Sequence, residues 1–154
     1  MIADTEVRLA TLADAADIAA MSRAYIEVGL TSTWTETRIQ RSIQNPDTNV
    51  VVVSEKRAIV GFGIMSYPGE EAHLLLFAVT PARQRQGIGS AILDWLEEVA
   101  RAAGVRRIHV ECRRDNVAAR NFYAEHGYHE QTITKGYYRG TIDAIRFEKW
   151  LVPS

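Results

Sequence analysis

The sequence has one cysteine, four prolines and no long run of apolar residues. A single cysteine, Cys112, excludes an internal disulfide and a zinc site built on several cysteines. No apolar stretch approaches the ~18 residues that a membrane span needs, and residues 1–6 contain no signal-peptide core. A second domain would need roughly 100 further residues. We therefore expect a single soluble, cytoplasmic domain over residues 1–154.

Positive and negative charges nearly balance over the whole chain, but they are distributed unevenly along it. Residues 1–80 hold 6 Lys/Arg against 10 Asp/Glu, and residues 81–154 hold 12 against 9. A pI near 6.4 and the interspersed acids argue against a nucleic-acid partner. A small polyanionic ligand bound by the second half fits the division better. Chance asymmetry on a solvated surface explains the charges equally well.

Hydrophobic periodicity predicts an α/β (α+β) protein with one mixed sheet and helices on its faces. The apolar run 74–79 does not alternate, which is typical of a central strand buried on both faces. Three adjacent antiparallel strands are expected in mid-chain. The expected strands lie at 7–9, 50–53, 59–65, 72–79, 107–112, 128–133 and 142–150, and the helices at about 15–27, 35–44, 88–103 and 117–126.

The most informative stretch is Gln84-Arg85-Gln86-Gly87-Ile88-Gly89, which joins a predicted buried strand directly to a helix. Backbone N–H groups at a helix N-terminus have no intrahelical partners, and the helix dipole adds positive potential. Glycines let a phosphate approach the main chain closely. Arg83 and Arg85 are expected to add positive charge around such a phosphate.

Three phosphate-binding motifs compete for this loop. A P-loop is excluded because no Gly-Lys-Ser/Thr follows the glycines. A dinucleotide fingerprint needs a small residue where Ile92 stands and an early parallel βαβ unit, which is missing here. The remaining pattern, Gln/Arg-x-x-Gly-x-Gly/Ala, is the pyrophosphate loop of acetyl-CoA transferases. On its own, this pattern is explained equally well by two glycines that allow a turn.

A second motif follows in the stretch Glu111 to Tyr128. Asn116 is placed to cap a helix, and Tyr123 falls two turns later on roughly the same face. With both motifs present, the sequence resembles the GNAT superfamily of acyl-CoA-dependent N-acetyltransferases, from Val7 to Trp150 and most closely over 74–128. The resemblance implies a GNAT fold with a mostly antiparallel sheet of about seven strands and about four helices.

The resemblance also implies acetyl-CoA as the acyl donor and a set of residues that bind it. The backbone of 77–79 would pair with the pantetheine arm in a V between two splayed strands, the loop amides would bind the pyrophosphate, Asn116 would hydrogen-bond the arm and Tyr123 would lie by the sulfur. The implied cofactor-binding residues are Phe77, Ala78, Val79, Gln84, Arg85, Gln86, Gly87, Ile88, Gly89, Ser90, Asn116 and Tyr123.

One branch of the superfamily matches more closely. Residues 108–111, 136–138 and 143–145 resemble the ribosomal-protein N-terminal alanine acetyltransferases. This resemblance implies Glu111 as general base and Tyr123 as general acid. It also implies an amine acceptor, either a protein N-terminus or a small molecule, which would contact Trp34, Tyr137 and Tyr138. A homodimer is an expectation from the family alone.

Elementary chemistry makes these roles reasonable and leaves alternatives open. A carboxylate must take a proton from the amine, and partial burial is expected to raise the pKa of Glu111. Glu70 and Glu71 are rival bases. Cys112 would face away from Glu111 on the same strand.

The four histidines, His73, His109, His126 and His129, lack ligand-like spacing, so no metal is expected. Tyr123 could instead be a core aromatic and Trp34 a hydrophobe that caps a helix. A non-catalytic acyl-CoA-binding module is the alternative class of function.

Overall fold

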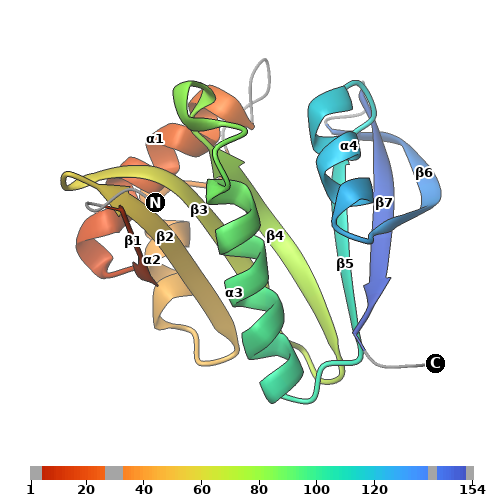
Figure 1. Ribbon diagram of the computed structural model, residues 1–154, viewed down its shortest axis with the longest axis horizontal. Helices are drawn as coiled ribbons and strands as arrows, with labels where there is room; N and C mark the ends of the chain where they lie inside the picture. Colours follow the sequence, from red (N-terminus) through yellow and green to blue (C-terminus); the bar gives the residue numbers. More distant parts are fainter. Residues whose placement is uncertain (1–4, 27–32, 139–141, 152–154) are drawn as a thin grey trace.

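The computed structural model describes residues 5–26, 33–138 and 142–151 and contains one mixed sheet flanked by helices (Figure 1). The sheet has seven strands in the order β1-β2-β3-β4-β5-β7-β6, and only the β4–β5 pair is parallel. The predicted fold class is therefore confirmed. The elements are β1 (Thr5–Leu9), α1 (Ala15–Tyr25), α2 (Glu36–Gln44), β2 (Thr48–Glu55), β3 (Ala58–Ser66), β4 (Glu71–Val79), α3 (Ile88–Ala102), β5 (Arg107–Arg113), α4 (Val117–Glu125), β6 (His129–Tyr138) and β7 (Ile142–Trp150).

Two hydrophobic cores cover opposite faces of the sheet. Helices α1 and α2 contribute to one core and α3 to the other. Helix α3 lies close to β3 because Gly61 and Gly63 have no side chains. A Cβ on Gly61 would lie 2.9 Å from Ile92, and one on Gly63 would lie 2.9 Å from Leu96. In the described part of the chain, no helix has the length and apolar character needed to cross a membrane.

The two halves of the sheet separate at its centre. Strands β4 and β5 pair only from Glu71↔Arg107 to Leu74↔Val110, and beyond this point they diverge (Figure 1). At the same point β4 contains a bulge, since Met65 is paired with Leu74 but Ile64 with Leu76. A bulge of this kind bends a strand and increases its twist. The C-terminal part of β4 is thereby directed away from β5.

The run 74–79 is buried on both faces of the sheet as expected, with Leu74 and Val79 in one core and Leu76 and Ala78 in the other. Within this run, Leu75 and Phe77 are only half-buried, whereas Leu74 and Leu76 are buried. The apolar side chains fill the two cores, but one edge of the strand is left without a neighbouring strand. Lack of alternation in the sequence therefore reflects packing on both faces, and the strand also borders a groove along its free edge.

A buried polar network joins α3 to the second half of the sheet. Glu97 is 3% exposed, and its carboxylate accepts hydrogen bonds from the Tyr128 hydroxyl at 2.8 Å and from Lys149 Nζ at 3.0 Å. Lys149 also donates to the carbonyl of His126 at 2.8 Å. Buried charges need such partners to remain stable. The network holds β7 and the end of α4 against α3, across the separation between the strands.

Candidate active site

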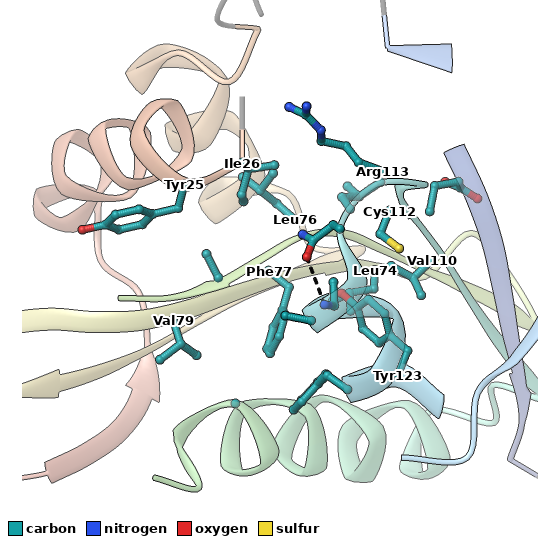
Figure 2. A pocket seen from close by; sticks show the side chains of 18 of the residues that line it. Tyr25, Ile26, Leu74, Leu76, Phe77, Val79, Val110, Cys112, Arg113 and Tyr123 are labelled. Atoms are coloured by element: carbon teal, nitrogen blue, oxygen red, sulfur yellow. Dashed lines mark hydrogen bonds between the residues drawn. The ribbon is translucent and has the colours of Figure 1, made fainter. Parts of the chain in front are cut away.

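A groove of about 1200 Å³ occupies the space between the diverging strands. Its walls come from β4, the end of β5, α4 and the loop that precedes α3. Figure 2 shows the side chain of Phe77 directed toward α3 and the ring of Tyr123 extending from α4 toward Leu74, whereas Leu76 and Ile26 lie on the opposite side of β4. The groove is therefore elongated along β4 and is bordered on one side by exposed main chain.

The edge of β4 that faces the groove offers hydrogen-bonding groups to a ligand. The Thr80 amide donates to the carbonyl of Val60 on β3 at 2.9 Å. Main-chain groups of an antiparallel strand alternate in direction, so those of Phe77 and Val79 point away from β3. The Val79 carbonyl accepts from Gln84 Nε2 at 3.1 Å. The amides of both residues and the Phe77 carbonyl remain on the groove side.

The loop before α3 has the backbone geometry of an anion site. Helix α3 begins at Ile88, and its N-cap, Gly87, has φ +84. The first N–H groups of the helix lack intrahelical acceptors. A Cβ on Gly87 would meet no atom within 4 Å, so this glycine is required by its backbone conformation and leaves open space above the loop.

Gly89 is required for a different reason from the one predicted. A Cβ at this position would lie 3.1 Å from Cε1 of Phe122 and 3.3 Å from Cζ of Phe77. The glycine thus allows the aromatic ring from α4 to pack on the first turn of α3. Ser90 strengthens the same junction, because its Oγ lies 2.8 Å from His126 Nε2.

Of the two loop arginines, Arg83 does not act as the sequence predicted. The guanidinium group of Arg83 forms an ion pair with Glu55 at the end of β2, so its charge is neutralised there. Arg85 is exposed, borders the groove and has φ +63. Of the two arginines, Arg85 is therefore the one that can face a ligand at the loop. The side chains of Gln86 and Ile88 do not line the groove, and Ile88 is buried in the core.

Helix α4 contributes two of the predicted residues. Asn116 caps the helix as predicted, since its Oδ1 accepts from the Ala119 amide at 3.0 Å. Tyr123 is 4% exposed and lines the groove, with its ring 6.2 Å from Phe77 and 5.7 Å from Phe147. The aromatic packing fixes the orientation of the Tyr123 ring at the deep part of the groove.

Glu111 is the carboxylate at the point where the strands separate, and two histidines contact it. His73 Nε2 lies 2.6 Å from Oε1, and His109 Nδ1 lies 3.4 Å from Oε2. The two imidazole rings stack with centroids 4.2 Å apart. The parallel register pairs His73 with His109, and Glu111 follows two residues later on the same face. Arg146 on β7 approaches Oε2 at 3.8 Å.

The expected direction of the Glu111 pKa was wrong. Burial acts to raise it, but the hydrogen bonds from His109 and His73, with their charges, outweigh burial and lower the pKa of Glu111 to about 2. The carboxylate is therefore ionised at neutral pH. Cys112, its neighbour, belongs to the α3-side core as predicted, but it also lines the groove, which was not predicted; burial raises the pKa of its thiol to about 11.

The histidine grouping could not be found from linear spacing. Among the described residues, His73, His109 and Glu111 are brought together with their ligand atoms within 4.8 Å of one another. The interplanar angle of the two rings is only 21°, so their in-plane lone pairs run side by side. A metal ion needs lone pairs that converge on one point. The arrangement suits hydrogen bonding to the carboxylate better.

The rival bases lie outside the groove. Glu71 pairs with Arg107 at 2.8 Å, and this partner lowers the pKa of Glu71. Neither Glu70 nor Glu71 is among the residues that line the groove, and both are exposed. Their position at the start of β4 directs them to solvent.

The predicted acceptor residues have mixed outcomes. Trp34 is 8% exposed and packs in the core beneath α1 and α2, with the Arg38 guanidinium 3.7 Å from its ring centroid. It also borders the groove. Tyr137 and Tyr138 belong to β6, but their side chains lie outside the described part of the structure.

Splayed central strands that lead to a helix N-terminus form a groove whose shape and main-chain donors suit an elongated, anion-bearing ligand. The chain belongs to the GNAT acetyltransferase family, whose sequence model matches residues 17–128. The predicted family is thus confirmed. The [ribosomal protein bS18]-alanine N-acetyltransferase of Escherichia coli K12 is 35% identical over 96 residues, which cover 60% of this chain and 65% of that protein. The match thus spans less than two thirds of that relative.

Solved structures agree with this assignment. The crystal structure of the ribosomal-protein-S18-alanine N-acetyltransferase from Escherichia coli has a TM-score of 0.81 and 26% identity, covering 97% of this chain and 96% of the other. Ard1 from Thermoplasma volcanium has a TM-score of 0.85 at 24% identity, covering 97% and 99%. The latter likeness concerns the fold alone.

Proposed function

We propose that this protein transfers the acetyl group of acetyl-CoA to a primary amine by direct attack, without a covalent enzyme intermediate. The observation that carries the proposal is the groove in which the unpaired edge of β4 leads to the exposed amides at the start of α3. The family membership supports the same chemistry. Residues 1–154 would form a single acetyltransferase domain.

Two parts of coenzyme A, the pyrophosphate and the pantetheine arm, would bind to main-chain groups of the groove. Its pyrophosphate would accept hydrogen bonds from the amides at 85–90, with Arg85 nearby. Its pantetheine arm contains amides that would pair with the groove-side groups of Phe77 and Val79. Asn116 lines the same groove and would add a side-chain amide. This direction brings the thioester toward Tyr123 and the point where the strands separate.

The leaving thiolate needs a proton, whereas the attacking amine must lose one. Thiolate leaves when the C–S bond breaks, and the Tyr123 hydroxyl would protonate it. A groove-side amide of β4 would stabilise the negative charge that develops on the carbonyl oxygen. Glu111 would attract the proton of the attacking amine. Its low pKa keeps it negative, which favours binding of an ammonium ion.

We further propose that the acceptor is the N-terminus of a protein. The support is the name of the Escherichia coli relative, which acts on an alanine of ribosomal protein bS18. A ribosomal substrate would be met in the cytoplasm. The alternative, a small-molecule amine, would use the same cofactor site. A homodimer rests on the family alone.

A thiol-release assay tests the proposal directly. Purified protein is mixed with acetyl-CoA and a panel that contains peptides with free or blocked N-termini and small amines. We expect CoA release that requires a free N-terminus and forms an acetylated peptide by mass spectrometry. Release with small amines only would overturn the protein acceptor. Tight acetyl-CoA binding without release for any amine would identify a non-catalytic binding module instead.

A further inference from the structure

Of the two stacked histidines, His73 lines the groove. Its side chain is 26% exposed and lines the groove, whereas that of His109 is 17% exposed and does not line it. The Nε2 atom of His73 is 2.6 Å from Glu111, while its Nδ1 has no hydrogen-bond partner within the described residues. One nitrogen therefore contacts the carboxylate, and the other is available to a ligand.

This arrangement determines which tautomer is favoured. A carboxylate accepts hydrogen bonds only, so Nε2 of a neutral His73 must donate its proton to Glu111. Nδ1 then carries the lone pair. An ionised carboxylate behind an imidazole fixes its orientation and stabilises the imidazolium that forms when the ring takes a proton. The stacked ring of His109 contacts the other oxygen and holds Glu111 from the opposite side.

We infer that His73 is the residue that takes the proton from the attacking amine, with Glu111 as the residue that positions and charges it. This inference rests on the proposed acetyl transfer and deepens it. A neutral imidazole with a free lone pair can accept a proton, whereas a carboxylate of very low pKa accepts protons poorly. Glu111 alone would therefore be a weak base.

The step balances as follows. The acceptor ammonium ion first releases one proton to solvent, which leaves a neutral amine. The amine nitrogen then attacks the thioester carbonyl carbon and forms the C–N bond, and one N–H proton moves to Nδ1 of His73. The C–S bond breaks, and the departing sulfur takes a proton from Tyr123. The imidazolium of His73 then releases its proton to solvent at the groove mouth, and Tyr123 is protonated again from solvent. The products are the amide and CoA.

Several charged or titratable groups lie around this histidine. On β5 they are Glu111 and His109, and on β7 they are Arg146, 3.8 Å from Glu111, and Glu148, which is paired in register with His109. On β4 itself, Glu71 is paired with Arg107. Any apparent pKa in a rate profile belongs to this group as a whole.

The test compares His73→Gln with Glu111→Gln. Glutamine keeps an N–H donor for the carboxylate but cannot take a proton. Acetyl-CoA affinity, measured by calorimetry, should stay within about 3-fold, and kcat should fall about 100-fold in each variant. The double variant should lose little more than either single one, because the two residues act as a unit. His129→Gln, an exposed histidine on β6 outside the groove, is the matched control and should retain full kcat.

Two readouts separate catalysis from a structural role. Imidazole added to His73→Ala should raise kcat by about 10-fold or more, and the acidic limb of the wild-type kcat profile should be lost in His73→Gln. Wild-type turnover is established first, and its failure overturns the proposed function and this inference with it. Full kcat of His73→Gln alongside an impaired Glu111→Gln, or an acidic limb that persists unchanged in His73→Gln, overturns this inference alone.

Discussion

Removal of the Tyr123 hydroxyl isolates the proposed proton donor from the packing of its ring. The ring is 4% exposed and contacts Phe77, Phe122 and Phe147, so Tyr123→Phe keeps the aromatic contacts and deletes one oxygen. Loss of a hydrogen-bonding group of this kind costs about 1 kcal/mol of stability. In a chain of this length that corresponds to a fall of about 3 °C in Tm. The fold and the groove should therefore persist.

The kinetic effect should be much larger than the effect on stability. General acid catalysis contributes about 100-fold or more, so kcat should fall by at least that factor, or about 2.7 kcal/mol of barrier. Acetyl-CoA affinity should change by less than about 3-fold, because the ring remains in place. The thiol-release assay measures kcat, and calorimetry measures affinity. Unchanged kcat would refute the role of Tyr123 as acid.

A truncation serves as the matched comparison. Tyr123→Ala removes the ring itself and should cost about 3–5 kcal/mol of stability, since a large buried aromatic side chain is lost. Acetyl-CoA affinity should fall in this variant as the groove wall collapses. The two substitutions thus separate the chemistry of the hydroxyl from the packing of the ring.

The remaining predictions concern the loop glycines and Glu111. Gly89→Ala should weaken acetyl-CoA binding about 10-fold, because its Cβ would lie 3.1 Å from Phe122 and displace α4; unchanged affinity in calorimetry would contradict this. Gly87→Ala has space for its Cβ but should lose about 1 kcal/mol in urea unfolding, because φ is +84. The pKa of Glu111 is lowered from 4.5 to about 2, so its ionised form stabilises the fold above pH 4.5, and this contribution is lost as pH falls toward 2. Glu111→Gln should lose less stability than wild type over that range in urea unfolding, and equal losses would argue against the pKa shift.

Local motifs were the features that the sequence predicted well. The helix that begins at Ile88 and the Asn116 cap depend on residues within a few positions of each other, so their patterns are readable without knowledge of the fold. The order of strands and helices was likewise predictable from hydrophobic periodicity. The roles of the other residues in the loop before α3 were predicted only in part, because Arg83 is paired with Glu55, which lies 28 positions away in the sequence.

Features that depend on strand register were not predictable. His73 and Glu111 are 38 positions apart, and they meet because β4 and β5 pair in parallel with His73 opposite His109. No sequence spacing encodes that register. The lowering of the Glu111 pKa was missed for the same reason. The burial of Glu111 could be anticipated from the sequence, but its two histidine partners could not. A predicted parallel pairing of 72–74 with 108–110 would have been the signal to look for.

The most direct test of the central claim is a calorimetric titration of the protein with acetyl-CoA and with S-acetylpantetheine, which lacks the pyrophosphate. The account predicts one acetyl-CoA per chain, and affinity for the truncated compound that is at least about 100-fold lower, because the amides at 85–90 then have no anion to bind. Equal affinity for the two compounds, or no binding of acetyl-CoA at all, would contradict it.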